Sequence, residues 1–286
     1  MRRKLSCCLA IALMLTLLAG CGGPSAAQTD SPAPESQAVE TDPMPATPEP
    51  APTPTPEPTP TPLPWPVYEF GVPVEESEPA EDDGIFENAL FLGDSRTEGL
   101  ELFGGLKHGT FYWARGLTAF RVDDEKYKIV SIDDETFTVM EALRRQSFDA
   151  VYIMIGVNEL GYSAESYEAG LSALVDGVVE AQPEAVVYLQ IMPPLNDNLC
   201  RANGLASYIN NDNLQKFNEA IQRVAAEKKV ALLNTAEVYT GEDGQLPAEL
   251  ANDGCHFAYR AYSLWANYLR GHIIDRERYF YSREQA

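Results

Sequence analysis

Two short segments of the chain hold the residue types that carry out nucleophilic catalysis. Gly93–Ser95 ends in a serine, and Asp253–His256 begins with an aspartate and ends with a histidine. A serine hydroxyl becomes a strong nucleophile when an imidazole takes its proton, and a carboxylate that accepts the Nδ1–H of that imidazole keeps it in the right orientation. The two segments together supply the parts of a Ser-His-Asp triad, provided that the fold brings Ser95 next to His256.

Each of these residues also has an ordinary structural interpretation. Ser95–Glu98 fits the capping-box pattern, so Ser95 taken alone is better explained as the cap of a helix. Asp253 can likewise be a helix cap and His256 a surface residue, while Asn158, which follows an apolar run, suits a turn. Only the fold decides between the structural and the catalytic interpretation.

The apolar runs from residue 85 onward predict the fold class. Short continuous apolar runs are typical of strands buried on both faces, and helices between them favour a parallel sheet covered on both sides. The predicted strands span residues 89–92, 111–114, 150–155, 185–191 and 230–233. The predicted helices span residues 95–102, 136–146, 164–182, 213–228 and 259–271, and a polar stretch at 121–135 is expected to form an inserted hairpin. We therefore expect an α/β fold, a three-layer α/β/α sandwich with a five-stranded parallel, flavodoxin-like sheet.

The candidate catalytic residues all follow predicted strands, at ends that meet on one edge of such a sheet. Ser95 follows the first strand, Gly116 the second and Asn158 the third. Asp253 and His256 lie in the loop after the fifth strand. Because ligands of doubly wound sheets bind beyond the carboxyl ends of the strands, we expect these residues to gather at one site.

Four segments in this order resemble the sequence blocks of the SGNH (GDSL-type) hydrolase family. The blocks are Gly93–Ser95, Gly116, Gly156–Asn158 and Asp253–His256, and the resemblance extends over nearly all of residues 88–271. It implies a serine ester hydrolase that works through an acyl-enzyme and that needs no metal and no organic cofactor.

The resemblance also implies a role for each residue. Ser95 is implied as the nucleophile, His256 as the general base and Asp253 as the residue that orients His256. The N–H groups of Ser95 and Gly116 and the side-chain amide of Asn158 are implied to form the oxyanion hole, which stabilises the negative oxygen of the tetrahedral intermediate.

Two positions depart from the family pattern. Arg96 stands where the name-giving leucine of the family would be, and this points away from the lipase branch. Ala261 replaces a glycine that is common in the last block, a packing change from which we expect little effect.

The first 20 residues resemble the signal peptide of a bacterial lipoprotein. Three cationic residues, Arg2–Lys4, precede an apolar run, Leu5–Ala19, that is shorter than the roughly 20 residues of a membrane-spanning helix. The run leads through small residues into Cys21. By this resemblance the chain is cleaved before Cys21, which then carries a diacylglyceryl group. We expect the mature protein to be lipid-anchored to the extracytoplasmic side of the bacterial cell membrane.

Residues 21–84 differ in composition from the segments on either side. They contain 17 of the 21 prolines of the chain, and proline takes every even position from Pro48 to Pro66. Such a sequence cannot build a packed core, and it favours polyproline II. We expect a disordered, Pro/Thr/Glu-rich linker that holds a hydrolase domain of residues 85–286 away from the membrane.

Net charge and cysteine content limit the partners of the protein. A formal net charge of −22 repels nucleic acid and anionic lipid, so membrane attachment is expected through Cys21 and not through a basic patch. Cys200 and Cys255 remain after processing, and an oxidising compartment slightly favours a disulfide between them over two free thiols. Metal binding would need more ligands than the sequence groups together.

These features lead to a hypothesis about the substrate. An acidic domain on an extracytoplasmic spacer suits an esterase that removes small acyl groups, O-acetyl above all, from carbohydrate. Candidates for stacking on sugar rings are Tyr112, Trp113, Tyr162 and Tyr208, although core packing explains each at least as well. Two alternatives are a glycan O-acyltransferase with the same triad and a catalytically silent, lipid-anchored glycan-binding module.

Overall fold

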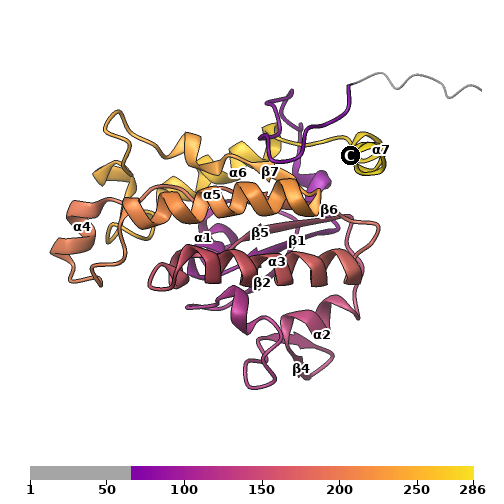
Figure 1. Cartoon of the computed structure of the whole chain (residues 1–286), viewed down its shortest axis with the longest axis horizontal. Helices are drawn as coiled ribbons and strands as arrows, with labels where there is room; N and C mark the ends of the chain where they lie inside the picture. The colour runs from indigo at the N-terminus through magenta and orange to yellow at the C-terminus, as the bar shows by residue number, and fades with distance from the viewer. Residues whose placement is uncertain (1–65) are drawn as a thin grey trace, which may run out of the picture. The chain divides into compact units, whose positions relative to one another are not determined.

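Five parallel strands form the central sheet of the protein, whose computed structural model describes residues 66–286 (Figure 1). The strands are β1 (Ala89–Gly93), β2 (Thr110–Trp113), β5 (Ala150–Met154), β6 (Val186–Gln190) and β7 (Ala231–Leu233). They pair in the order β2-β1-β5-β6-β7, so sheet growth changes direction between β1 and β5. This arrangement confirms the predicted fold class. In such a sheet, ligands bind at the carboxyl ends of the two strands where the direction changes.

Helices cover both faces of the sheet, and for this reason the strands consist mainly of apolar residues. Every residue of β1 and β6 is buried. One face is covered by α2 (Val139–Leu143), α3 (Ala164–Ala181) and α5 (Asn211–Lys228). The other is covered by α1 (Ser95–Phe103), α6 (Tyr262–Gly271) and α7 (Arg276–Gln285). In Figure 1, α3 and α5 lie in front of the sheet.

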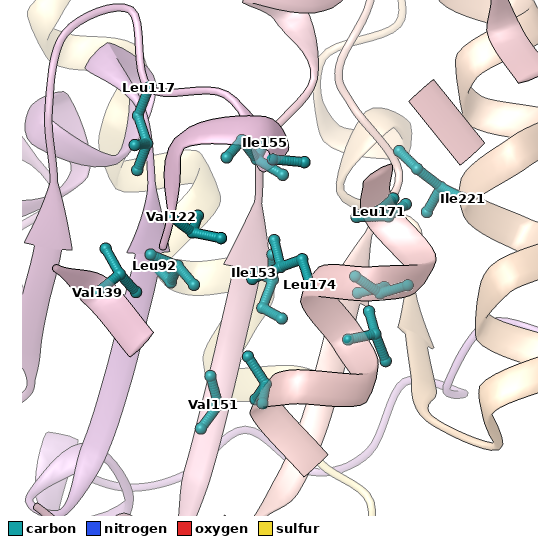
Figure 2. Packing of buried hydrophobic residues seen from close by; sticks show 14 of the residues in the cluster. Leu92, Leu117, Val122, Val139, Val151, Ile153, Ile155, Leu171, Leu174 and Ile221 are labelled. Atoms are coloured by element: carbon teal, nitrogen blue, oxygen red, sulfur yellow. The ribbon is translucent and has the colours of Figure 1, made fainter. Parts of the chain in front are cut away.

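The core on the α3 side shows how alternation along a strand separates the two faces. Leu92 of β1 and Val151 and Ile153 of β5 lie in this core. Their neighbours Phe91 and Tyr152 lie in the core on the α6 side, because successive strand residues point to opposite faces. Figure 2 shows the partners on the α3 side, which include Leu117, Val122, Val139, Leu171, Leu174 and Ile221. Burial of each such side chain stabilises the fold by about 1.5–3 kcal/mol, which holds the helices on the sheet.

The folded part begins earlier than the sequence analysis placed it. Residues 67–84, assigned there to the disordered linker, include side chains and backbone groups that pack against the domain. Val74 donates its N–H to the carbonyl oxygen of Leu232 at 2.8 Å, and Pro73 forms a parallel bridge with Leu232. Tyr68 is buried. The segment thereby covers part of the edge strand β7, whose unpaired backbone groups would otherwise be left open.

The inserted hairpin lies later than predicted. It consists of β3 (Val130–Ile132) and β4 (Glu135–Phe137), which pair antiparallel, whereas the sequence analysis placed it within residues 121–135. The turn is formed by Asp133 and Asp134, whose φ angles are 49° and 67°. Aspartate tolerates this left-handed conformation, so the dipeptide decides where the chain reverses.

Two helices, α4 (Asp197–Ala202) and α7, were not expected, because neither shows the apolar periodicity of an amphipathic helix. Within residues 66–286 no helix combines the length and the hydrophobicity needed to cross a membrane. The predicted signal peptide, Cys21 and the linker up to residue 65 lie outside the described residues.

Candidate active site

The turn between β1 and α1 presents Ser95 at the carboxyl edge of the sheet. Asp94, and not Ser95, is the N-cap of α1, since its Oδ1 accepts the N–H of Arg96 at 2.9 Å. Ser95 is the first helical residue, and its hydroxyl is therefore not used for capping. Gly93 permits the turn, because a Cβ at this position would lie 2.3 Å from the carbonyl oxygen of Met154.

The structure brings Ser95 and His256 together across 161 residues of sequence. The Oγ of Ser95 lies 2.8 Å from the Nε2 of His256, and the Nδ1 of His256 lies 2.8 Å from the Oδ2 of Asp253. The second carboxylate oxygen of Asp253 accepts the backbone N–H groups of Cys255 at 2.9 Å and of His256 at 2.7 Å. Hydroxyl, imidazole and carboxylate thus form one hydrogen-bonded chain.

The charge of Asp253 determines which tautomer of the imidazole is useful. Partial burial acts to raise the pKa of Asp253, but hydrogen bonds from the side chain and N–H of His256 and from the N–H of Cys255 outweigh it and hold the pKa below its usual range. An ionised Asp253 accepts the Nδ1–H of His256. The Nε2 lone pair is then directed at the hydroxyl of Ser95, as a general base requires.

Two backbone N–H groups that are predicted to form the oxyanion hole have no acceptor within residues 66–286. One belongs to Ser95 at the N-terminus of α1, and the other belongs to Gly116, which follows β2 in a left-handed conformation with φ 75°. Nothing lies within 4 Å of the position that a Cβ of Gly116 would take, so the space beside it is open. The helix N-terminus adds positive potential at this point, which suits a developing oxyanion.

Asn158 faces the same turn, but its amide is already engaged. Its Nδ2 donates to the Oδ2 of Asp94 at 3.2 Å and to the carbonyl oxygen of Leu117 at 3.1 Å. Both distances are at the long end of the range for N–H···O bonds. An oxyanion can therefore take one of these protons while the other bond keeps the amide in place.

Two buried carboxyl groups lie behind the nucleophile, and the sequence analysis assigned a role to neither. Asp94 is 1% exposed and Glu159 is 0% exposed. Burial raises the pKa of Asp94 against the opposing N–H and charge of Arg96, and it raises the pKa of Glu159 to about 8. The Oε1 of Glu159 accepts the N–H of Ala119 at 2.7 Å, whereas its Oε2 has no partner in the described part of the chain. Each acid directly adjoins a motif residue in the sequence, which is the signal that could have identified them.

Cys200 and Cys255 do not form the disulfide that was expected. The sequence slightly favoured a disulfide between Cys200 and Cys255, but the structure has both as buried free cysteines. Both belong to the hydrophobic core on the α5 side, where a thiol packs as a small apolar side chain. Burial raises the pKa of both thiols, that of Cys200 to about 11, so they stay protonated. Gly254, with φ 97°, lies against Cys200, where a Cβ would be 2.5 Å from the backbone nitrogen.

A cavity of about 440 Å³ opens beside the hydroxyl of Ser95. Its lining residues are Ser95, Glu98, Gly99, Leu102, Phe103, Arg115, Asn252, His256, Phe257 and Tyr262. Arg115 and Glu98 form a bidentate ion pair there, with N–O distances of 2.6 and 2.7 Å. The ring of Tyr262 occupies the space that a side chain at Gly99 would need, with its Cζ 2.0 Å from the Cβ position. This ring packs on α1 one helical turn beyond Ser95, and the lining of the cavity continues along the helix to Leu102 and Phe103.

The aromatic residues that were expected to stack on sugar rings do not line this cavity. Tyr112 is buried against Phe148, and the Nε1 of Trp113 donates to Glu101. Tyr162 and Tyr208 are exposed outside the cavity. The rings that line it are instead those of Phe103, Phe257 and Tyr262.

A second cavity, of about 410 Å³, shares no lining residue with the one beside Ser95. It lies between α5 and the loops that follow β6 and β7, and it holds none of the candidate catalytic residues. Within residues 66–286 no three His, Cys, Asp or Glu side chains are grouped so that they could hold a metal ion. The cavity beside Ser95, which is lined by both Ser95 and His256, is therefore the candidate active site.

Comparison with known proteins gives one family match and several structural likenesses. Residues 91–264 match the model of the GDSL-like Lipase/Acylhydrolase family. A candidate platelet activating factor from Streptococcus pneumoniae has a TM-score of 0.51 at 21% identity, over 65% of this chain and 84% of that one. A GDSL-like lipase from Bacteroides thetaiotaomicron has a TM-score of 0.46 at 15% identity, over 64% of this chain and 86% of that one.

A candidate SGNH hydrolase from Slackia heliotrinireducens has a TM-score of 0.49 at 18% identity, over 65% of this chain and 97% of that one. No curated protein matches the chain. The likeness to the Streptococcus pneumoniae protein shows a shared fold.

Proposed function

Because the chain belongs to the GDSL-like lipase/acylhydrolase family and is an acyl hydrolase, we propose that it is a serine esterase acting through Ser95, His256 and Asp253. The family match covers more than half of the chain and confirms the resemblance drawn from the four sequence blocks. The proposal for the catalytic residues is supported above all by the unbroken hydrogen-bonded chain from the Oγ of Ser95 through His256 to Asp253.

Acylation begins when the Oγ of Ser95 attacks the carbonyl carbon of the ester and the Nε2 of His256 takes the hydroxyl proton. The carbonyl oxygen becomes an oxyanion, which accepts hydrogen bonds from the N–H groups of Ser95 and Gly116 and from the amide of Asn158. As the tetrahedral intermediate collapses, the bond to the alcohol oxygen breaks and His256 gives its proton to that oxygen. Asp253 stabilises the imidazolium between these two proton transfers.

Deacylation repeats the same steps with water in place of the alcohol. His256 removes a proton from water as the water oxygen attacks the acyl carbon, and the same N–H groups stabilise the second oxyanion. Collapse breaks the bond between the acyl carbon and the Oγ of Ser95. The proton on His256 returns to that oxygen, and the carboxylic acid leaves.

The proposed substrates are short acyl esters, O-acetyl above all, on carbohydrate outside the cytoplasm. A short acyl group is supported by the ring of Tyr262, which lines the cavity and fills the space next to Gly99, one helical turn along α1 from Ser95. A carbohydrate is supported by the ion pair of Arg115 and Glu98, whose polar atoms can bond hydroxyl groups, and by the ring of Phe103. The lipoprotein-like leader and the proline-rich linker support the location.

A panel of esters tests the reaction and the acyl length. We expect acetyl esters and acetylated oligosaccharides to be hydrolysed much faster than long-chain esters. Ser95→Ala should lower kcat by about 10⁶-fold, because the nucleophile is lost. The control is Ser131→Ala, which removes an exposed hydroxyl of β3 and should leave kcat unchanged. Steady-state rates and quantification of free acetate provide both measurements.

Other outcomes separate the alternatives. A preference for long-chain esters would contradict the proposed substrate, and an unchanged rate for Ser95→Ala would contradict the nucleophile. Transfer of the acetyl group to an added glycan, in place of free acetate, would indicate the acyltransferase. Binding of glycan by a protein that does not react with a fluorophosphonate would indicate the silent binding module. The location is tested by Cys21→Ser, which should release the protein from the membrane fraction.

A further inference from the structure

Arg96 is a buried cation that directly follows the proposed nucleophile. Its side chain is 1% exposed, and its guanidinium bonds to backbone carbonyl groups. The Nε and Nη2 atoms donate to the carbonyl oxygen of Cys255 at 3.1 and 2.9 Å, and Nη1 donates to that of Pro193 at 3.3 Å. The guanidinium carbon also lies 5.0 Å from the centroid of the Phe257 ring, within the range of a cation–π contact.

These contacts join three segments of the chain, two of which carry Ser95 and His256. Arg96 lies in the first turn of α1 beside Ser95, Cys255 immediately precedes His256, and Pro193 lies in the loop between β6 and α4. Within residues 66–286 neither carbonyl oxygen accepts a hydrogen bond from any other group. In that part of the chain, Arg96 is thus the only donor to the carbonyl group of the peptide that links Cys255 to His256.

A buried cation with carbonyl partners costs more than an apolar side chain would. Removing a guanidinium from water is unfavourable unless its donors are satisfied, and a leucine at this position would avoid that cost. The arginine does have one property that leucine lacks, which is a rigid fork of N–H donors. Two donors on the one oxygen of Cys255 fix that peptide in both distance and direction.

We propose that Arg96 is a positioning residue for catalysis, which sets the distance between the Nε2 of His256 and the Oγ of Ser95 by holding the carbonyl group of Cys255. The inference rests on the proposed triad. Ser95 and His256 lie on separate segments, and Arg96 connects those segments next to both residues. The rate of catalysis is sensitive to the relative position of the reacting groups, since a displacement of about 1 Å can lower it by about 100-fold.

Substitutions of Arg96 in the full chain test this role. We expect Arg96→Leu to lower kcat for a soluble acetyl ester by about 100-fold, with KM changed by less than about twofold. Arg96→Lys keeps the charge and can still donate to one carbonyl group, so it should recover about tenfold of this loss. Rates are normalised to the folded protein. The proton NMR signal of the His256 Nδ1–H should shift in Arg96→Leu, which a purely structural role would not require.

Arg270→Leu is the matched control. Arg270 is a partly buried arginine whose Nε lies 2.7 Å from the Oδ1 of Asp83, outside the site. This variant should lower the melting temperature and leave kcat and the His256 signal unchanged. If Arg96→Leu does not fold, Arg96→Lys decides the question. A loss of kcat that exceeds that of Arg270→Leu supports the proposal, and a wild-type kcat overturns it.

Ser95→Ala in the same assay separates the two proposals. If Ser95→Ala retains the wild-type rate, the triad is wrong and the role of Arg96 is overturned with it. If Ser95→Ala is inactive while folded Arg96→Leu keeps the wild-type kcat and an unshifted His256 signal, the triad stands and only the role of Arg96 is overturned.

Discussion

The two sides of the candidate active site are built in opposite ways. On the nucleophile side (residues 93–97 and 156–159), the acids Asp94 and Glu159 are 1% and 0% exposed. On the base side (residues 252–257), the side chains of Asp253 and His256 are 30% and 37% exposed. Burial raises the pKa of the acids on the nucleophile side, whereas hydrogen bonds hold the pKa of Asp253 below its usual range.

This difference follows from what each side has to do in the proposed reaction. The nucleophile side must keep a turn and its N–H groups in place, and a buried acid contributes there as a hydrogen-bond partner. The base side must stabilise an imidazole that gains and loses a proton, which needs a permanent negative charge beside it. A carboxyl group thus holds the turn in place on the nucleophile side, whereas on the base side it supplies a negative charge to the imidazole.

Among the substitutions that leave Ser95 in place, removing the charge on the base side has the largest expected effect. In Asp253→Asn the amide oxygen can keep the bonds from the backbone, but its NH2 group then faces the Nδ1 of His256. His256 must present an N–H to Ser95, which is the wrong tautomer for a base, and kcat should fall by about 10⁴-fold. Steady-state kinetics on an acetyl ester measure this. The control is Asp83→Asn, which loses an ion pair outside the site and should keep kcat. A loss below about tenfold for Asp253→Asn would contradict an electrostatic base side.

On the nucleophile side we expect a smaller loss from Asn158→Ala. The substitution removes an oxyanion donor together with the bond to Asp94, and kcat should fall by about 10²–10³-fold. KM should change little, because the donor matters most when charge develops on the oxygen. Kinetics with the same ester measure both parameters.

Asn218→Ala is the control for this prediction. It removes two bonds of 2.9 Å to the backbone of Met192, outside the site, and should lower stability without changing kcat. If Asn158→Ala costs no more than Asn218→Ala, the amide of Asn158 serves only to pack the turn.

The two sides also differ in how far the sequence predicts them. Ser95, Gly116 and Asn158 each follow a strand, and the ends of parallel strands meet at one edge, so the apolar pattern was enough to expect them together. His256 lies in a long loop, and periodicity does not say where such a loop folds back. The loop depends in part on Arg96, whose carbonyl partners are backbone groups that leave no trace in the residue types.

The start of the fold was mispredicted for a related reason. The segment has the overall composition of a linker, but residues 67–74 form a short apolar stretch in which Tyr68 and Val74 are buried. The segment is held in place by the edge of β7, where it bonds to the backbone of Leu232. Composition averages over a window, and it therefore misses a short apolar stretch near the end of a proline-rich segment.

The smallest effect on kcat is expected where a buried acid titrates without taking part in the reaction, so that its charge affects stability instead. The pKa of Glu159 is raised from 4.5 to about 8, because burial and the neighbouring Asp94 disfavour its charged form. The folded state therefore binds this proton more tightly than the unfolded state does. The resulting stability is fully present below about pH 4.5 and is lost as the pH rises through about 8, with a slope of about 1.4 kcal/mol per pH unit at most. Glu159→Gln keeps an acceptor for the N–H of Ala119 and carries no charge, so it should remove this loss.

Urea unfolding of the wild type and Glu159→Gln between about pH 5 and 9 measures this difference as a free energy of unfolding. The wild type should lose stability relative to the variant as the pH rises. Glu184→Gln, which changes a carboxyl group that is 86% exposed, should follow the wild type. Parallel curves for the wild type and Glu159→Gln would mean that Glu159 is ionised throughout, as Asp253 is. The contrast between a neutral acid behind the nucleophile and an ionised acid beside the base would then be lost.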